Sequence, residues 1–166
     1  MKRSIARTTF VIISIVTLGM GLATAAYAED DGGCSTARVA GKWGFTLTGT
    51  LLLPAPIGPV PGAAVGRISV DAAGNISGTE ARNVGGGFAN ETITGSWTVN
   101  SNCTTIVTVK IYESGVLVRT SVLSGVFVNQ SNKLRAVQES LTNPDGSTIP
   151  VVITLDGDRL FHENGD

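Results

Sequence analysis

The chain has 166 residues, with 12 lysines and arginines, 13 aspartates and glutamates, and a formal net charge of −1. This length suits one domain with one hydrophobic core. The charge gives no electrostatic footprint for nucleic acid or for an anionic membrane surface, so neither is expected as a partner. The single histidine, His162, has no convergent ligands in the sequence, and we therefore expect no metal site and no cofactor.

The first 28 residues have the three parts of a secretory signal. Lys2, Arg3 and Arg7 form the positive segment, residues 10–23 are an apolar run, and Ala26-Tyr27-Ala28 offers small residues to a signal peptidase. The apolar run is shorter than the ~20 residues that a membrane-spanning helix needs. We therefore predict a bacterial-type signal peptide over residues 1–28, a secreted or periplasmic mature chain with a net charge of about −4, and no membrane span after cleavage.

Residues 29–40 are interpreted as an N-terminal lead-in to a single β-domain over residues 41–166. The two cysteines of the chain are Cys34, in the lead-in, and Cys103. In an exported chain a disulfide is the default for such a pair. The bond would tie the lead-in to the turn at residues 100–102, and the absence of a C-x-x-C motif disfavours a redox role.

The β-domain repeats one pattern, an alternating apolar and polar run followed by a break of Gly, Asn, Asp or Ser. In the first run, residues 42–52, Trp43, Phe45 and Leu47 share one face, as in a half-buried strand. Further runs span residues 63–71, 76–84, 88–100, 104–113, 116–129, 133–142 and 147–155. Breaks of two to five residues are typical of hairpins. We therefore predict an all-β, antiparallel up-and-down barrel of about eight strands with very little helix, and a β-sandwich as the alternative.

Two segments are expected to lie outside the strands. Residues 53–62 contain four of the six prolines, and a stiff apolar loop is predicted because proline is excluded from central strands. This loop is a candidate contact surface or cavity lid, or else a plug over one barrel end. Residues 156–158, Asp-Gly-Asp, are interpreted as a turn, followed by a polar tail from Arg159.

The run at residues 116–129 is apolar on both faces, with Val122 and Val126 on one and Leu123 and Phe127 on the other. Burial on both faces would indicate a homo-oligomer interface or an overlying segment. Local β-propensity is the alternative explanation.

The first run begins with Gly41-Lys42-Trp43-Gly44-Phe45, a G-x-[WY]-G-[FY] pattern. With this pattern, and with the stretch Thr94-Gly95-Ser96-Trp97-Thr98-Val99-Asn100, the chain resembles a group of small, uncharacterised secreted bacterial β-proteins. That resemblance implies no activity. Gly41-x-Trp43 and Arg159 are also similar to features of the lipocalins, whose tryptophan plugs the closed barrel end while the arginine packs across it. The resemblance implies these roles for Trp43 and Arg159.

The first functional hypothesis is an exported, non-enzymatic barrel that binds a small hydrophobic molecule. If the barrel is hollow, apolar inward-facing residues should line the cavity. The predicted ligand-binding residues are Trp43, Phe45, Leu47, Ile57, Ile93 and Trp97, with Val107, Val109, Ile149, Val151 and Ile153 alongside them. Because no catalytic signature is found, the alternative is a structural or adhesive envelope or extracellular protein.

A second alternative is a cyclase or isomerase that uses a buried glutamate. Glu80, Glu91 and Glu139 share strand parity with apolar residues, and Arg82 shares the parity of Glu80. A carboxylate on an apolar face is costly unless it is paired, and it can acquire a raised pKa and serve as acid, base or ligand hook. The alternative is that such a glutamate lies at a strand end, at the rim of the barrel, or beside a bulge that flips the parity of its strand.

Overall fold

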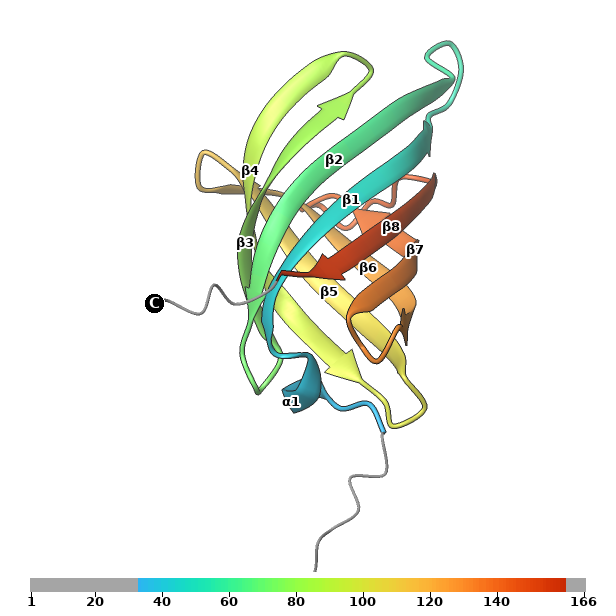
Figure 1. The fold of residues 1–166 in the computed structure, drawn as a ribbon. Coiled ribbons are helices and arrows are strands. Elements are labelled where there is room, and N and C mark those ends of the chain that lie inside the picture. The colour runs from blue at the N-terminus through green and yellow to red at the C-terminus, as the bar shows by residue number, and fades with distance from the viewer. Residues whose placement is uncertain (1–32, 161–166) are drawn as a thin grey trace, which may run out of the picture. The chain divides into compact units, whose positions relative to one another are not determined.

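The computed structural model describes residues 33–160, which form a closed barrel of eight antiparallel strands (Figure 1). The strands are β1 (Gly41–Leu52), β2 (Pro59–Val70), β3 (Asn75–Val84), β4 (Gly87–Val99), β5 (Thr104–Glu113), β6 (Val116–Val128), β7 (Lys133–Thr142) and β8 (Val151–Arg159). Each strand pairs with the next, and β1 pairs with β8, which closes the barrel. The predicted up-and-down barrel is confirmed. The predicted signal peptide and His162 lie outside the described residues.

A four-residue helix, α1 (Thr36–Val39), lies in the lead-in and crosses the barrel end where β1 begins (Figure 1). Ser35 caps the helix, because its hydroxyl accepts a hydrogen bond of 3.2 Å from the backbone N–H of Arg38. Val39 is fully buried against the core. The predicted disulfide between Cys34 and Cys103 is present, so this segment is covalently held to the barrel.

Three aromatic rings fill the barrel at the α1 end. The ring centroids of Trp43 and Trp97 are 5.3 Å apart, and Phe127 stacks on Trp97 at 5.5 Å. The indole N–H of Trp43 donates to the carbonyl of Val39 at 2.9 Å, which fixes the ring under α1. The guanidinium carbon of Arg159 lies 5.9 Å from the Trp43 ring centroid, within cation–π range. This end of the barrel is therefore closed, with the Arg159 guanidinium packed against Trp43.

The prediction that residues 53–62 form one loop is wrong for the last part of that segment. β2 begins at Pro59, and Pro59 and Pro61 pair with Leu52 and Thr50 of β1. The carbonyl of Pro61 accepts from the N–H of Gly85, so the Pro61 nitrogen faces the same way, away from β1. Neither proline therefore interrupts the β1 ladder. The paired register of β3 with β2 begins only at Gly62, beyond the prolines.

The last predicted strand and turn are also wrong. β8 begins after Pro150 and continues to Arg159, so residues 156–158 are strand residues between β1 and β7. Asp158 on the outer face forms an ion pair with Lys133 at 2.9 Å, and Asp156 forms one with Arg135. Gly157 faces inward and is buried. Asp and Gly favour turns in general, but here cross-strand pairing on both sides outweighs that local preference.

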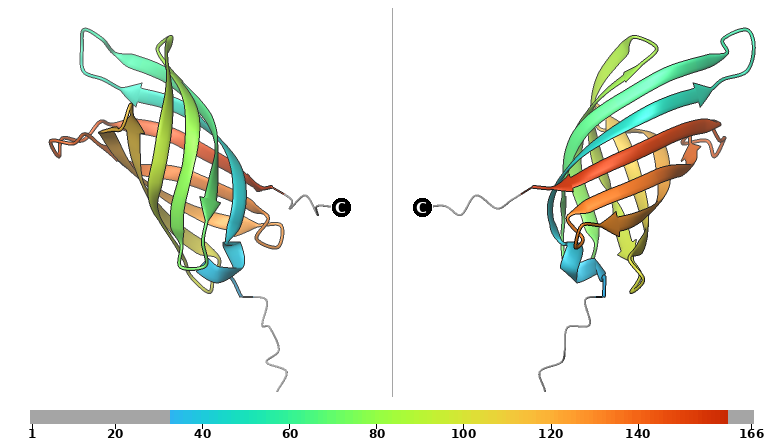
Figure 2. Two further views of the ribbon diagram at one scale, coloured as in Figure 1. Left: turned by 90° about the vertical axis from the view of Figure 1, so that its left-hand side faces the viewer. Right: turned by 45° about the vertical axis from the view of Figure 1, so that its right-hand side comes forward.

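The barrel end opposite α1 carries the β1–β2 and β3–β4 turns and the β7–β8 connection (Figure 2). No helix in the described part of the chain is long and apolar enough to span a membrane. In β6, Leu123 and Phe127 face the core, whereas Val126 and Val128 are exposed on the outside. An oligomer interface on that outer face stays a prediction.

Candidate functional site

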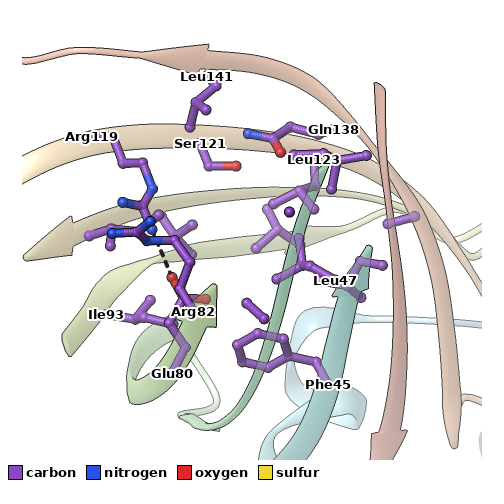
Figure 3. A pocket seen from close by; sticks show the side chains of 18 of the residues that line it. Phe45, Leu47, Glu80, Arg82, Ile93, Arg119, Ser121, Leu123, Gln138 and Leu141 are labelled. Carbon is purple, nitrogen blue, oxygen red and sulfur yellow. Dashed lines mark hydrogen bonds and ion pairs between the residues drawn. The ribbon is translucent and has the colours of Figure 1, made fainter. Parts of the chain in front are cut away.

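The barrel encloses a cavity of about 270 Å³ between the aromatic plug and the open end. All eight strands contribute to its wall, because alternate residues of each strand face inward. The wall is largely apolar, with Ile68, Ile111, Leu123 and Leu155 among its residues. Figure 3 shows Phe45 and Leu47 on one side of this space and Glu80, Arg82 and Arg119 on another.

Most of the predicted lining residues lie at this cavity. They are Trp43, Phe45, Leu47, Ile93 and Trp97, together with Val107, Val109, Ile149 and Ile153. Ile57 and Val151 are not among the lining residues. Ile57 is 67% exposed in the tight turn that joins β1 to β2, and this turn projects beyond the open end because both strands are long (Figure 1). Whether the lining residues contact a ligand stays a prediction.

A cluster of four charged side chains lies at one side of the cavity, and three of them, Glu80, Arg82 and Arg119, line it. Glu80 and Glu91 are directly opposite each other in the register of β3 and β4. Arg119 of β6 donates to Glu91 at 2.8 Å through Nη1, again to Glu91 through Nη2, and to Glu80 at 3.2 Å through Nη2. Arg82 donates to Glu91 through Nε at 3.0 Å. The Glu91 side chain is completely buried and that of Glu80 is 5% exposed, so these ion pairs lie in a poorly solvated environment.

The pKa values of the two carboxyl groups in the cluster shift in opposite directions from their usual value. Burial, the hydrogen bond to Glu91 and the Glu91 charge raise the pKa of Glu80 to about 7, against the attraction of Arg119 and Arg82. Burial also acts to raise the pKa of Glu91, but hydrogen bonds from Arg119, Glu80 and Arg82 outweigh it and lower the pKa. At neutral pH Glu91 is therefore ionised, while Glu80 is close to half protonated.

Glu139, the third glutamate singled out by parity, lies on the outer face of β7, where Ser124 donates to it. The register of β6 with β7 shifts between Val122 and Leu123, and Leu123 is opposite Gln138 while Val122 is opposite Ser140. Glu139 is the extra residue of this bulge. The inward-facing residues of β7 therefore change from even to odd numbers, with Gln138 facing inward before the bulge and Leu141 after it. The bulge explanation is correct for this glutamate.

Arg119 was missed by the sequence reasoning, although a signal for it exists. It has the parity of Leu123 and Phe127, the inward-facing residues of β6. An arginine at that parity, in a chain with two glutamates on apolar strand faces, indicates an internal ion pair. Ser121 and Gln138 add polar groups to the cavity wall and were also not predicted (Figure 3).

This arrangement has limited chemical capacities. The apolar wall can hold a small hydrophobic group, and the guanidinium groups can hold an anion or a hydrogen-bond acceptor. Glu80 can exchange a proton near neutral pH. Among the described residues, no group of three or more His, Cys, Asp and Glu side chains could hold a metal ion.

Comparisons with known proteins identify the fold alone. No family model matches the chain, and no curated protein matches it. A structure of EF1p2_mFAP2b bound to DFHBI matches 75% of this chain and 98% of its own, at 12% identity and a TM-score of 0.50. A redesigned β-barrel, mFAP1, bound to DFHBI, matches 75% of this chain and 97% of its own, at 14% identity and a TM-score of 0.48. The first of these matches shows that the chain is similar in fold to a β-barrel of known structure.

Proposed function

We propose that this protein is an exported, non-enzymatic barrel that binds a small hydrophobic molecule in its cavity. The observation that carries the proposal is a largely apolar cavity of about 270 Å³ inside the barrel, closed at one end by Trp43, Trp97 and Phe127 and open at the other. A core built only for stability is packed to crystal-like density and leaves few voids larger than a water molecule. A space of this size therefore favours a ligand.

The volume limits the size of that ligand. Typical ligand pockets measure about 300–1,000 Å³, and a dry apolar cavity of about 150 Å³ accepts benzene. This cavity lies between the two, so a short-chain or one- to two-ring molecule fits better than a long lipid. The EF1p2_mFAP2b structure is described as bound to DFHBI, which supports the view that a barrel of this kind accommodates a small molecule.

Export is the second part of the proposal. It is supported by the signal-like segment at residues 1–28 and by the disulfide, a bond that persists in oxidising compartments. We expect the exported protein to begin at Glu29, and an intact-mass measurement under non-reducing conditions checks this. A retained N-terminal segment or two free thiols would contradict the export proposal without affecting the cavity.

The binding proposal is tested by extracting the purified protein with organic solvent and identifying any bound molecule by mass spectrometry. In parallel, the neutral two-ring dye prodan is titrated into the protein, and a dissociation constant below ~100 μM, a binding free energy of about 5.5 kcal/mol, is expected. If nothing is extracted and no dye or screened apolar compound binds below that threshold, the structural or adhesive role becomes the better proposal.

A second candidate function is acid–base catalysis by Glu80, as in a cyclase or isomerase. The observation that favours it is the pKa of Glu80, raised to about 7 beside Glu91, whose pKa is lowered. Two carboxyl groups driven apart in this way are typical of acid–base pairs. Once a ligand has been extracted, its recovery unchanged after incubation with the protein at pH 7 would exclude this candidate.

A further inference from the structure

The proposed binding function rests on the apolar part of the cavity, and the charged cluster in its wall narrows the class of ligand. We propose that the ligand is a small apolar acid, whose carboxylate pairs with the guanidinium groups of Arg119 and Arg82 while its apolar part lies against the aromatic plug. This inference rests on the proposed function and deepens it.

The two arginines have hydrogen-bonding capacity left over. A guanidinium group carries five N–H donors. Arg119 uses three of them, for Glu80 and Glu91, and Arg82 uses only Nε, for Glu91. Both side chains line the cavity, and they are 15% and 23% exposed respectively. Guanidinium groups bind carboxylates through paired N–H donors, so the remaining donors at the cavity wall match a ligand carboxylate.

The charge of the cluster also favours an anion. Arg82 and Arg119 are both cationic, and Glu91 is held ionised by three hydrogen bonds from arginines. When Glu80 is protonated, the cluster therefore carries one uncompensated positive charge next to an apolar space. An unpaired charge in such a place is costly. A ligand anion would offset it, whereas a cationic ligand would be repelled.

The position of the cluster sets the orientation of the ligand. Along β3, Glu80 lies midway between Ile76, in the buried core at the closed end, and Val84, at the open end. Along β4, the cavity-lining residues Ile93 and Trp97 follow Glu91 in the direction of the closed end, where Trp97 is part of the plug. A carboxylate at Arg119 would therefore place the apolar tail toward the plug.

The pH dependence follows from the groups that face Glu80, namely Arg82 on its own strand, Glu91 on β4 and Arg119 on β6. A protonated Glu80 leaves Arg119 to the ligand and removes a competing anion. The pKa of Glu80 is about 7, so the fraction of protein with a protonated Glu80 falls about tenfold between pH 6 and pH 8. If the acid binds only to that protonated form, its apparent dissociation constant is about tenfold larger at pH 8 than at pH 6. A neutral ligand would show no such change.

The test uses three ligands of equal chain length, namely octanoate, 1-octanol and octylamine, titrated calorimetrically into the exported protein at pH 6 and pH 8. We expect octanoate to bind at least about tenfold more tightly than octanol at pH 6 and octylamine to bind most weakly. Equal affinity for octanol and octanoate would overturn this inference and leave the proposed function standing. If neither these ligands nor the neutral dye binds, it is the proposed function that fails.

Variants separate a ligand-binding cluster from a purely structural one. We expect Arg119→Gln to abolish the preference for octanoate over octanol, whereas Arg135→Gln, which removes an exposed ion pair with Asp156, should retain it. Glu80→Gln should give equal octanoate affinities at pH 6 and pH 8. If Arg119→Gln does not fold, Arg82→Gln replaces it, because Arg82 donates only one of the four hydrogen bonds from arginine in the cluster. An octanoate preference unchanged in every folded arginine variant would contradict the inference.

Discussion

Glu80 and Glu91 lie directly opposite each other on β3 and β4, yet their pKa values move in opposite directions. Burial is the largest influence on both groups and raises the pKa of Glu80, but Arg119 contacts Glu91 through two nitrogens and Glu80 through only one. At Glu91 the hydrogen bonds, chiefly those from Arg119, therefore outweigh burial and lower the pKa. Two carboxyl groups on directly opposite residues disfavour ionisation of both at once, because their negative charges repel. The carboxyl that receives fewer hydrogen bonds from arginine therefore retains its proton to higher pH, and the pair titrates as a coupled unit.

We predict that Glu80 makes the protein less stable as the pH rises toward neutrality. The pKa of Glu80 is about 7 in the folded protein against 4.5 in the unfolded chain, so the folded state binds more protons between these values. The free energy of unfolding should therefore fall across pH 4.5–7, by on the order of 3 kcal/mol from this group. In Glu80→Gln, whose amide resembles the protonated acid, this decline should be absent.

Urea unfolding at pH 5, 6, 7 and 8 measures this effect as the difference in the free energy of unfolding between Glu80→Gln and the wild type. Glu139→Gln is the matched control, because Glu139 is also a strand glutamate but is exposed on the outer face. Parallel pH curves for wild type and Glu80→Gln would show that the Glu80 pKa is not raised in the folded protein.

The sequence predicted the barrel well because its strands are short, alternate in polarity and end at clear breaks. Six of the eight strand ranges agree with the structure to within one residue at either end, as for residues 104–113. The cavity-facing positions of β1 and β4 followed from the same alternation, since neither strand contains a bulge before Trp43, Phe45, Ile93 or Trp97.

The charged cluster could be predicted only in part, because it depends on contacts across the barrel. Parity placed Glu80 and Glu91 on inward faces, but it also placed Glu139 there, and one bulge reversed that result. That Arg119 reaches two glutamates 28 and 39 residues earlier in the chain depends on barrel closure and strand tilt. Local sequence contains no information on either quantity.

We predict that the disulfide is a major contributor to stability. It joins residues 69 apart in the sequence, and a loop of this length gives about 4 kcal/mol in the chain-entropy model. It also holds α1 over the plug, where Val39 is fully buried. The free energy of unfolding of the double variant Cys34→Ser/Cys103→Ser, measured with urea, should be about 2–4 kcal/mol lower than that of the wild type. Wild type measured in reducing agent should show a similar loss, and a loss below about 1 kcal/mol in both would contradict the prediction.

We predict that two inward-facing glycines of β2 respond differently to alanine. A Cβ at Gly66 would lie 2.6 Å from Cζ of Phe45 and would collide with the backbone oxygen of Thr79, so the barrel wall would have to shift. A Cβ at Gly62 would lie 3.2 and 3.4 Å from side-chain methyl groups of Val84 and Leu51, and 3.8 Å from the backbone oxygen of Asn83, which is ordinary van der Waals contact. Gly66→Ala should therefore lower the free energy of unfolding by about 1–3 kcal/mol, and Gly62→Ala should lower it much less. Thermal unfolding of both variants measures the difference, and equal melting temperatures would contradict it.

The last prediction concerns the cavity as the place of binding. Ala64 lies on β2 between Leu47 and Arg82, both of which line the cavity, and it lines the cavity itself. The leucine side chain at this position would occupy part of the cavity, whose volume is about 270 Å³, and would leave less space for a ligand. Filling a cavity generally maintains or raises stability, so Ala64→Leu should fold normally and yet bind the two-ring dye prodan at least about tenfold more weakly, a loss of about 1.4 kcal/mol of binding free energy. Ala81→Leu is the matched control, because Ala81 has the opposite parity to Glu80 on β3 and is not part of the cavity wall. If both variants bind the dye as wild type does, the dye binds outside the barrel, and the interior is not the site.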